Sequence, residues 1–175
     1  MKKVPYLIVV DMQKDFVDGA LGSPQAQAMV PAAVEKIRDF KGIIIFTRDT
    51  HQEDYLSTQE GRYLPVPHCI KGTEGWEIIP ELRAFSEGER ARVINKPSFG
   101  STVLSALLTE EREEIESLEL IGLCTDICVV SNVLLIKAAL PELPLRVDSR
   151  CCAGVTPEKH EAALETMRSC QIEVL

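Results

Sequence analysis

Short runs of apolar residues recur along the chain, and longer helix-like stretches separate them. The expected strands are Val4–Val10, Ile43–Thr47, Ala91–Ile94, Leu118–Ile121, Leu143–Val147 and Ile172–Leu175. The expected helices are Pro31–Phe40, Ser101–Leu108, Ile127–Leu140 and Pro157–Ser169. Strands that are apolar throughout, rather than alternating, indicate burial on both faces of a sheet. Their alternation with helices predicts a three-layer α/β/α fold around a parallel sheet.

One stretch breaks this rhythm. Residues Asp49–Pro80 are polar, carry Gly, Pro and aromatic residues, and show little periodicity. A loop of this length inside a compact domain is usually functional. The chain of 175 residues has the length of one domain with a proper core, so we expect a single domain over residues 1–175.

Composition excludes several classes of function. The net charge is −8 and no basic cluster occurs, so nucleic acid is not an expected partner. Asp11 interrupts the first apolar run, and no segment approaches the roughly 20 apolar residues of a membrane helix. The six cysteines lack the regular spacing of a disulfide framework, which favours reduced thiols and a cytoplasmic protein.

The segment Gly122–Val130 has the pattern of a strand, a tight turn and a helix. Thr125 or Asp126 is placed to cap that helix, and Cys128 then falls in its first turn. The unpaired N–H groups of a helix start favour a thiolate, so Cys128 is a candidate nucleophile. The alternative is a buried small hydrophobe, since free cysteines are often fully buried.

Polar residues follow the ends of the first four expected strands. Asp11 follows the first, Asp49 and His51 the second, Lys96 the third and Cys128 the fourth. In open α/β sheets these carboxyl ends form the ligand site. A carboxylate that takes the thiol proton and an ammonium that keeps the acid ionised would permit nucleophilic chemistry. Each residue also has a plain alternative: Asp11 as a turn cap, Lys96 as a solvated lysine or as the partner of Asp126.

Two of the three histidines lie in the long polar segment. Asp49 and His51 are two residues apart, and Glu60 and then His68 follow. Carboxylates and imidazoles suit Zn²⁺, Mn²⁺ or Fe²⁺. Histidines in polar loops are often merely solvated, so the bare pattern leaves both interpretations open.

Three segments together resemble a known superfamily. Asp11–Phe16, Lys96–Phe99 and Gly122–Val129 are similar to the signatures of the isochorismatase-like cysteine hydrolases, in the same order along the whole chain. The resemblance implies a six-stranded parallel sheet flanked by helices.

The resemblance also implies roles for individual residues. Asp11, Lys96 and Cys128 would form a catalytic triad, and a cis peptide bond would lie at Leu123–Cys124. The backbone N–H groups of Cys124 and Cys128 would form an oxyanion hole.

Within the superfamily the metal pattern is similar to that of the nicotinamidases. Carried across, the ligands are Asp49, His51, Glu60 and His68, and they would hold one divalent metal ion, Zn²⁺ before Mn²⁺ or Fe²⁺. In that family the metal coordinates the pyridine nitrogen of nicotinamide and places its carboxamide over the cysteine. Isochorismatases proper and many carbamoyl-cleaving relatives lack this metal set.

The chain departs from the nicotinamidase pattern at some positions. No tryptophan lies between Glu60 and His68, so the aromatic wall of the substrate site would come from Phe16, Phe99 or Tyr63. No histidine lies near Tyr55, so the third metal ligand rests on Glu60 alone. Two unusual adjacent cysteines, at positions 151 and 152, follow the fifth expected strand.

The expected function is hydrolysis of nicotinamide to nicotinate and ammonia through a cysteine thioester, by a cytoplasmic homo-oligomer. One alternative is another hydrolase of the superfamily acting on a different small amide or carbamoyl compound. A second is a thiol redox or sensor protein that uses Cys124 and Cys128, which leaves Asp11 and Lys96 unexplained. A third is an inert scaffold that binds metabolites, against which the intact triad argues.

Overall fold

The fold is built on a six-stranded sheet whose strands are all parallel. The computed structural model describes residues 3–89 and 91–175. The strands are β1 (Val4–Val10), β2 (Ile43–Asp49), β3 (Ala91–Lys96), β4 (Ile115–Leu123), β5 (Leu145–Ala153) and β6 (Glu173–Val174). They lie in the order β3-β2-β1-β4-β5-β6. The predicted α/β/α fold is confirmed.

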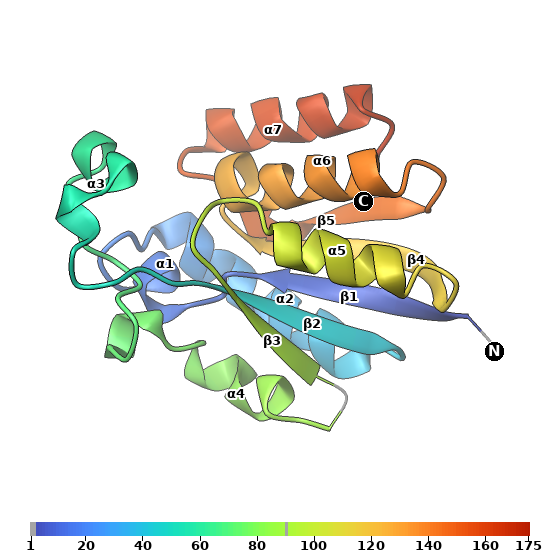
Figure 1. Cartoon of the computed structure of the whole chain (residues 1–175), viewed down its shortest axis with the longest axis horizontal. Helices are drawn as coiled ribbons and strands as arrows, with labels where there is room; N and C mark the ends of the chain where they lie inside the picture. Colours follow the sequence, from blue (N-terminus) through green and yellow to red (C-terminus); the bar gives the residue numbers. More distant parts are fainter. Residues whose placement is uncertain (1–2, 90) are drawn as a thin grey trace.

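Helices cover both faces of this sheet (Figure 1). One face carries α5 (Thr102–Glu110), α6 (Val130–Ala139) and α7 (Pro157–Ser169), and the other carries α1 (Lys14–Val17), α2 (Pro24–Asp39) and α4 (Pro80–Ser86). Successive side chains of β1 alternate between the two cores: Ile8 packs with the first set of helices, and Leu7 with the second. Burial on both faces explains why the strands are apolar throughout.

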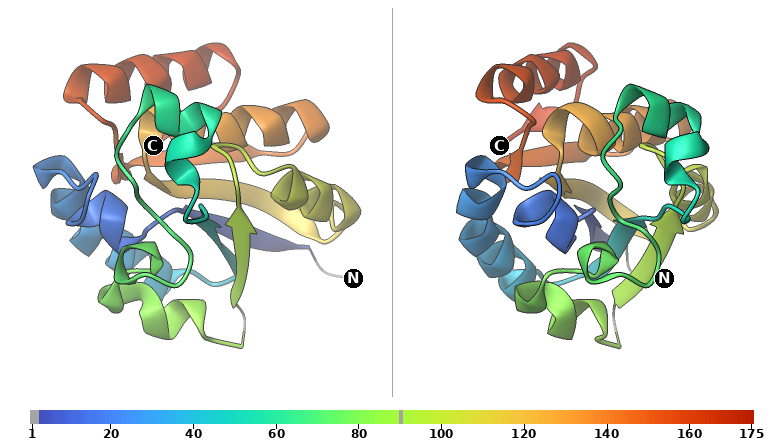
Figure 2. Two further views of the ribbon diagram at one scale, coloured as in Figure 1. Left: turned by 60° about the vertical axis from the view of Figure 1, so that its left-hand side comes forward. Right: turned by 90° about the vertical axis from the view of Figure 1, so that its left-hand side faces the viewer.

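The strand order reverses between β1 and β4. In such sheets the ligand site lies at this switch point, outside the carboxyl ends of the strands. Residues 50–80 wind across that end of the molecule, which faces the viewer in the right panel of Figure 2. They include three short helical segments, η1 (Tyr55–Ser57), α3 (Gln59–Tyr63) and η2 (Glu74–Trp76).

The expected helix Pro31–Phe40 has the wrong start. Helix α2 begins at Pro24, and the Ser23 side chain caps it by accepting a 3.0 Å hydrogen bond from the Ala26 N–H. Serine before a proline at the first helical position is a strong start signal. Pro31 therefore lies inside the helix.

Strand β5 extends beyond its expected end at Val147. Leu120 of β4 pairs with Val147, but Gly122 pairs with Cys152, so β5 is irregular between these two points. This irregular part includes Asp148, which is fully buried and forms an ion pair with Lys36 of α2. Strand β5 therefore continues through Asp148, because Lys36 on the covering helix pairs with its charge.

Two further observations concern the chain as a whole. None of the helices in residues 3–89 and 91–175 has both the length and the apolar character required to cross a membrane. All six cysteines lie in the described residues and are free thiols.

Candidate active site and metal centre

A thiol, an ammonium and a carboxylate meet at the carboxyl end of the sheet. Lys96 Nζ lies 2.6 Å from Asp11 Oδ2 and 3.4 Å from Cys128 Sγ. Lys96 also donates a 3.0 Å hydrogen bond to the Ser98 carbonyl. The three side chains are buried, with 0%, 1% and 4% exposure for Asp11, Lys96 and Cys128. The structure thus brings together the three residues expected to form a triad, and Lys96 pairs with Asp11 rather than Asp126.

Asp11 is fixed by the neighbouring strand. Its backbone lies in the left-handed region, with φ of 48°, which is uncommon outside glycine and is found at functional sites. The Thr47 hydroxyl donates a 2.6 Å hydrogen bond to Asp11 Oδ1, and the Asp11 N–H donates to the Thr47 carbonyl at 3.2 Å. Thr47 was not predicted as a site residue, although a polar residue at the end of the run Ile43–Phe46 was a detectable signal.

The candidate nucleophile, Cys128, lies in an irregular helical turn after β4. The turn η3 (Thr125–Val129) is a π-helix whose N-cap residue is Cys124. The expected cis peptide bond at Leu123–Cys124 is present. Gly122 just before it has φ of 119°, and a Cβ atom there would collide with the Val10 carbonyl of β1. Only glycine permits β4 to approach β1 so closely at this point.

The expected helix cap at Thr125 or Asp126 is wrong, since neither side chain caps the turn. Thr125 Oγ1 instead lies 2.7 Å from Nδ1 of His160 on α7. Asp126 Oδ1 accepts a 2.9 Å hydrogen bond from the Val155 N–H. Both side chains therefore attach the nucleophile turn to the start of α7.

The pKa of the Cys128 thiol shifts in the direction opposite to the one expected from a helix start. Burial raises the pKa of the Cys128 thiol and the Asp11 carboxylate raises it further, while Lys96 lowers it. Burial also raises the pKa of Asp11, although Lys96 partly offsets this shift. Burial alone would lower the pKa of Lys96, but the charges of Asp11, Cys128 and Asp49 raise it. A thiol whose pKa is raised needs a proton acceptor to become a nucleophile, and Asp11 is the candidate.

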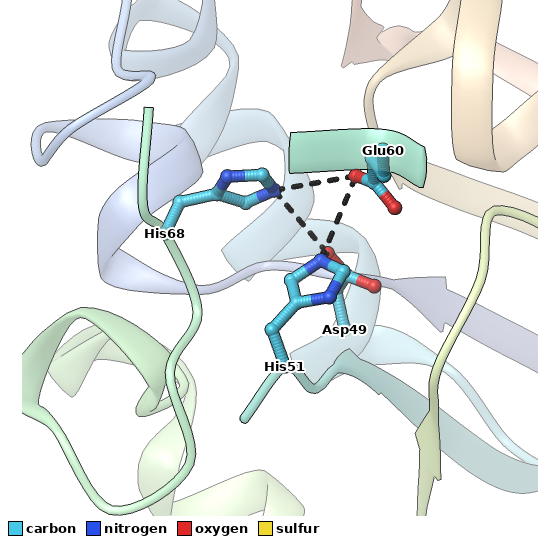
Figure 3. A group of neighbouring side chains, drawn as sticks. All are labelled: Asp49, His51, Glu60 and His68. Carbon is cyan, nitrogen blue, oxygen red and sulfur yellow. Dashed lines mark hydrogen bonds and ion pairs between the residues drawn. The ribbon is translucent and has the colours of Figure 1, made fainter. Parts of the chain in front are cut away.

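A second cluster, called the metal cradle below, consists of Asp49, His51, Glu60 and His68 (Figure 3). One ligand atom from each residue lies within 4.8 Å of all the others. His51 Nε2 is 3.0 Å from Asp49 Oδ2 and 3.6 Å from Glu60 Oε1. His68 Nε2 is 3.6 Å from the same Asp49 oxygen and 3.7 Å from the same Glu60 oxygen.

These separations fit a bound ion. Donor atoms around a tetrahedral Zn²⁺, at about 2.0–2.2 Å from the metal, lie about 3.3–3.6 Å from one another. His68 Nδ1 lies 2.8 Å from the Val66 carbonyl, so a neutral ring that donates from Nδ1 would offer the Nε2 lone pair to the cluster. Burial alone would raise the pKa of Asp49, but its interactions with His51, His68 and Lys96 lower it, so a carboxylate is available as a ligand.

Aromatic packing supports the two imidazoles. The Tyr55 ring is 1% exposed and contacts both imidazoles edge-on, with centroid distances of 4.7 Å to His51 and 5.0 Å to His68. The buried Phe16 ring lies 5.5 Å from His68. Of the other two expected wall residues, Phe99 is half exposed and Tyr63 is 85% exposed. Tyr55 was considered only for its lack of a histidine neighbour, and its support of the cradle was not predicted.

The thiol centre and the metal cradle share a boundary. Lys96 Nζ lies 3.4 Å from Asp49 Oδ1, while the other Asp49 oxygen faces the imidazoles. A single lysine therefore contacts the acid, the thiol and one candidate metal ligand. A substrate held at the cradle would lie beside the thiol.

Asn132 of α6 supports the thiol centre and was also not predicted. Its amide N–H₂ donates to the carbonyls of Cys128 at 2.8 Å and Phe99 at 3.1 Å. Its oxygen accepts a 2.9 Å hydrogen bond from the Ser101 N–H. The loop after Lys96 is thereby attached to the nucleophile helix. An amide within the apolar stretch Val129–Ile136 was the available signal.

Comparison with known proteins agrees with this geometry. The sequence model of the isochorismatase domain matches residues 5–175. The chain belongs to the isochorismatase family. The resemblance seen in the sequence is thus confirmed.

Solved structures of relatives have the same fold. A pyrazinamidase of Pyrococcus horikoshii in complex with zinc is 31% identical, with a TM-score of 0.82 over 98% of both chains. A nicotinamidase/pyrazinamidase of Bacillus subtilis is 29% identical, with a TM-score of 0.81 over 99% of both chains. An N-carbamoylsarcosine amidase of Thermoplasma acidophilum is 27% identical, with a TM-score of 0.75 over 99% of this chain and 95% of the other. The prediction of a hydrolase similar to nicotinamidases is confirmed.

Proposed function

We propose that this protein is a metal-dependent amidohydrolase that converts nicotinamide to nicotinate and ammonia. The observation that carries the proposal is the contact of Lys96 with both groups of residues, at 3.4 Å from Cys128 Sγ and 3.4 Å from Asp49 Oδ1. A nucleophile alone would serve many amides. A nucleophile connected to a metal cradle through one shared lysine favours an amide that carries a metal-binding ring nitrogen.

Acylation begins with a proton transfer. The Asp11 carboxylate takes the Cys128 proton, and the sulfur forms a bond to the carboxamide carbon. The backbone N–H groups of Cys124 and Cys128 donate hydrogen bonds to the oxyanion that results. Asp11 returns the proton to the nitrogen as the C–N bond breaks, so ammonia leaves and a thioester remains. Lys96 stays protonated and keeps Asp11 able to ionise.

Deacylation reverses the roles. Asp11 takes a proton from water as the water oxygen attacks the thioester carbon. The C–S bond breaks, the carboxylic acid is released, and the thiol recovers its proton. The raised pKa of Asp11 suits a residue that accepts and returns a proton in each half-reaction.

Asp49, His51, Glu60 and His68 would hold the metal, with Zn²⁺ favoured over Mn²⁺ or Fe²⁺ for two nitrogen and two oxygen donors. When bound, the ion supplies a Lewis acid for the pyridine nitrogen of the substrate. Phe99 is the candidate ring wall on the thiol side, since its carbonyl is fixed by Asn132. We also propose a cytoplasmic location, where free thiols are maintained.

Ammonia release from three substrates tests the proposal. With the metal content measured in parallel, nicotinamide is expected to be hydrolysed and benzamide far more slowly, because benzamide lacks the ring nitrogen. N-carbamoylsarcosine is the third substrate, since one relative is named for it. Equal rates with nicotinamide and benzamide, or a preference for the carbamoyl compound, would contradict the assignment while leaving a cysteine hydrolase.

A matched pair of histidine variants tests the metal cradle. His51→Ala is expected to release the metal, because the remaining three donors no longer close a stable site. His160→Ala is the control, since its ring contacts Thr125 outside the cradle, and it is expected to keep the metal. Cys128→Ala is likewise expected to keep it. Equal metal content in the two histidine variants would contradict the proposed ligand set.

A further inference from the structure

Gln13 lies just after β1 and is completely buried. Its side-chain N–H₂ donates hydrogen bonds to the carbonyls of Asp49 at 2.8 Å and Trp76 at 2.9 Å. Its side-chain oxygen accepts a 2.7 Å hydrogen bond from the Asp49 N–H. One amide therefore satisfies both backbone polar groups of Asp49.

The backbone of Gln13 is fixed as firmly as its side chain. Its N–H donates to the Asp11 carbonyl at 2.8 Å, and its carbonyl accepts from the N–H groups of Phe16 and Val17, both at 3.1 Å. Gln13 also forms an antiparallel bridge with Ile78. Because its backbone and its side-chain amide are both held by buried hydrogen bonds, Gln13 fixes the position of the groups it contacts. Neither part can move without breaking those bonds.

We propose that Gln13 is a positioning residue for the metal centre. By fixing the Asp49 backbone, it sets where the Asp49 carboxylate lies relative to His51 and to Lys96. The inference rests on the metal cradle of the proposed function. Gln13 is two residues from Asp11. The turn that carries the proposed catalytic acid therefore also sets how far the Asp49 carboxylate lies from the metal site.

Asp15 provides a second attachment from the same turn. Its Oδ2 accepts a 2.7 Å hydrogen bond from the N–H of Cys69, the residue after His68. Alternate residues of Asp11–Asp15 thus serve the thiol centre, the Asp49 side and the His68 side. This arrangement connects the strand end to the irregular segment that supplies the ligands.

Asn132 provides a matched control for Gln13. Both are fully buried amides that donate to two backbone carbonyls and accept from one backbone N–H. Gln13 acts on the metal side, whereas Asn132 acts on the thiol side. Loss of either amide removes the same number and kind of hydrogen bonds, so a merely structural role predicts similar effects.

The test compares Gln13→Met with Asn132→Leu in the full chain. Zn²⁺ affinity is measured by chelator competition, and the absorption spectrum of bound Co²⁺ reports ligand geometry. Gln13→Met is expected to raise the Kd for Zn²⁺ about 10- to 100-fold, as is typical for residues that orient ligands, and to change the Co²⁺ spectrum. Asn132→Leu is expected to leave the Kd within about twofold, because none of its hydrogen-bond partners is a candidate metal ligand.

Two outcomes would overturn the inference about Gln13 while leaving the metal cradle in place. One is a Gln13→Met protein with wild-type Zn²⁺ affinity and Co²⁺ spectrum, and the other is an equal loss of affinity in both variants. If Gln13→Met does not fold, Gln13→Glu replaces it, since the carboxylate still accepts from the Asp49 N–H but cannot donate to two carbonyls. Gln13→Glu is also expected to bind Zn²⁺ at least about tenfold more weakly, and wild-type affinity there would overturn the inference. A wild-type protein that binds neither metal would instead overturn the cradle itself.

Discussion

Two buried aspartates, Asp11 and Asp148, are similar in setting and different in chemistry. Both are completely buried, and each pairs with one lysine: Asp11 with Lys96 at 2.6 Å, and Asp148 with Lys36 at 2.9 Å. Asp11 lies at the carboxyl end of β1 beside a thiol. Asp148 lies in the irregular part of β5, against α2. Burial and a lysine partner therefore do not by themselves make a catalytic acid.

The difference lies in the remaining partners of each carboxylate. Asp148 also accepts hydrogen bonds from the backbone N–H of Arg150 at 3.2 Å and from its guanidinium at 3.0 and 2.8 Å. Burial alone would raise the pKa of Asp148, but Arg150 and Lys36 lower it below the usual value. Burial raises the pKa of Asp11, and Lys96 and Thr47 offset this shift only in part.

The two carboxylates therefore differ in how readily each is expected to exchange a proton. The lowered pKa of Asp148 fits an ion-paired carboxylate that joins β5 to α2. The raised pKa of Asp11 beside Cys128 fits the general acid and base role proposed for it. The two aspartates differ in their remaining partners and in the direction of the pKa shift, although both form an ion pair with a lysine.

The largest expected effect is on kcat, which should fall in the variant of Asp11 but not in the variant of Asp148. Asp11→Asn is expected to lower kcat for nicotinamide by about 10³-fold or more, because the thiol loses its proton acceptor. Asp148→Asn, assayed at a temperature where both variants are folded, is expected to stay within about threefold of wild type, because it lies outside the site. Comparable losses of kcat in the two variants would remove the distinction.

The next largest effect is on the stability of the Asp11–Lys96 pair, which should respond to substitution differently from the activity. Lys96→Met leaves a buried carboxylate without its partner and is expected to lower the free energy of unfolding by about 3–5 kcal/mol. Adding Asp11→Asn should recover part of this stability, because the orphaned acid is removed. Activity should not recover, and the double variant should lose little beyond either single one. Denaturant unfolding and kcat measure both; additive losses of activity would show that the two residues do not act as a unit.

The smallest expected effect concerns Asp148 and pH. Its pKa is lowered in the folded state, so it contributes stability above the unfolded value of about 3.9 and loses that contribution as pH falls through the folded value. Asp148→Asn should therefore cost about 1–3 kcal/mol at neutral pH. The gap to wild type should close below about pH 4. Urea unfolding of both proteins from pH 7 to pH 3 measures this difference in the free energy of unfolding. A difference that does not change with pH would contradict the lowered pKa assigned to Asp148.

Much of the site followed from the sequence, because strands that are apolar throughout are easy to locate. The ends of parallel strands converge, so the residues after them could be collected as Asp11, Asp49, Lys96 and Cys128. The start of α2 was missed although the Ser23-Pro24 cap signal was present.

Other features had no comparable signal. Most partners of Gln13 and Asn132 are backbone atoms distant in sequence, and residue types do not specify which carbonyl an amide will reach. The thiolate expected at Cys128 followed from a helix start alone. Burial beside Asp11 reverses that shift, and burial is a property of the folded structure.

The central claim is that Cys128 forms a thioester with Asp11 as its proton acceptor. The most direct measurement is rapid acid quenching of the protein during turnover of nicotinamide, followed by mass spectrometry of the cysteine-containing peptides. We expect the mass of one nicotinoyl group on the peptide containing Cys128, its accumulation to be greatly slowed in Asp11→Asn, and no such mass in Cys128→Ala. Turnover without any acylated intermediate, or with the acyl group on Cys124, would contradict the account.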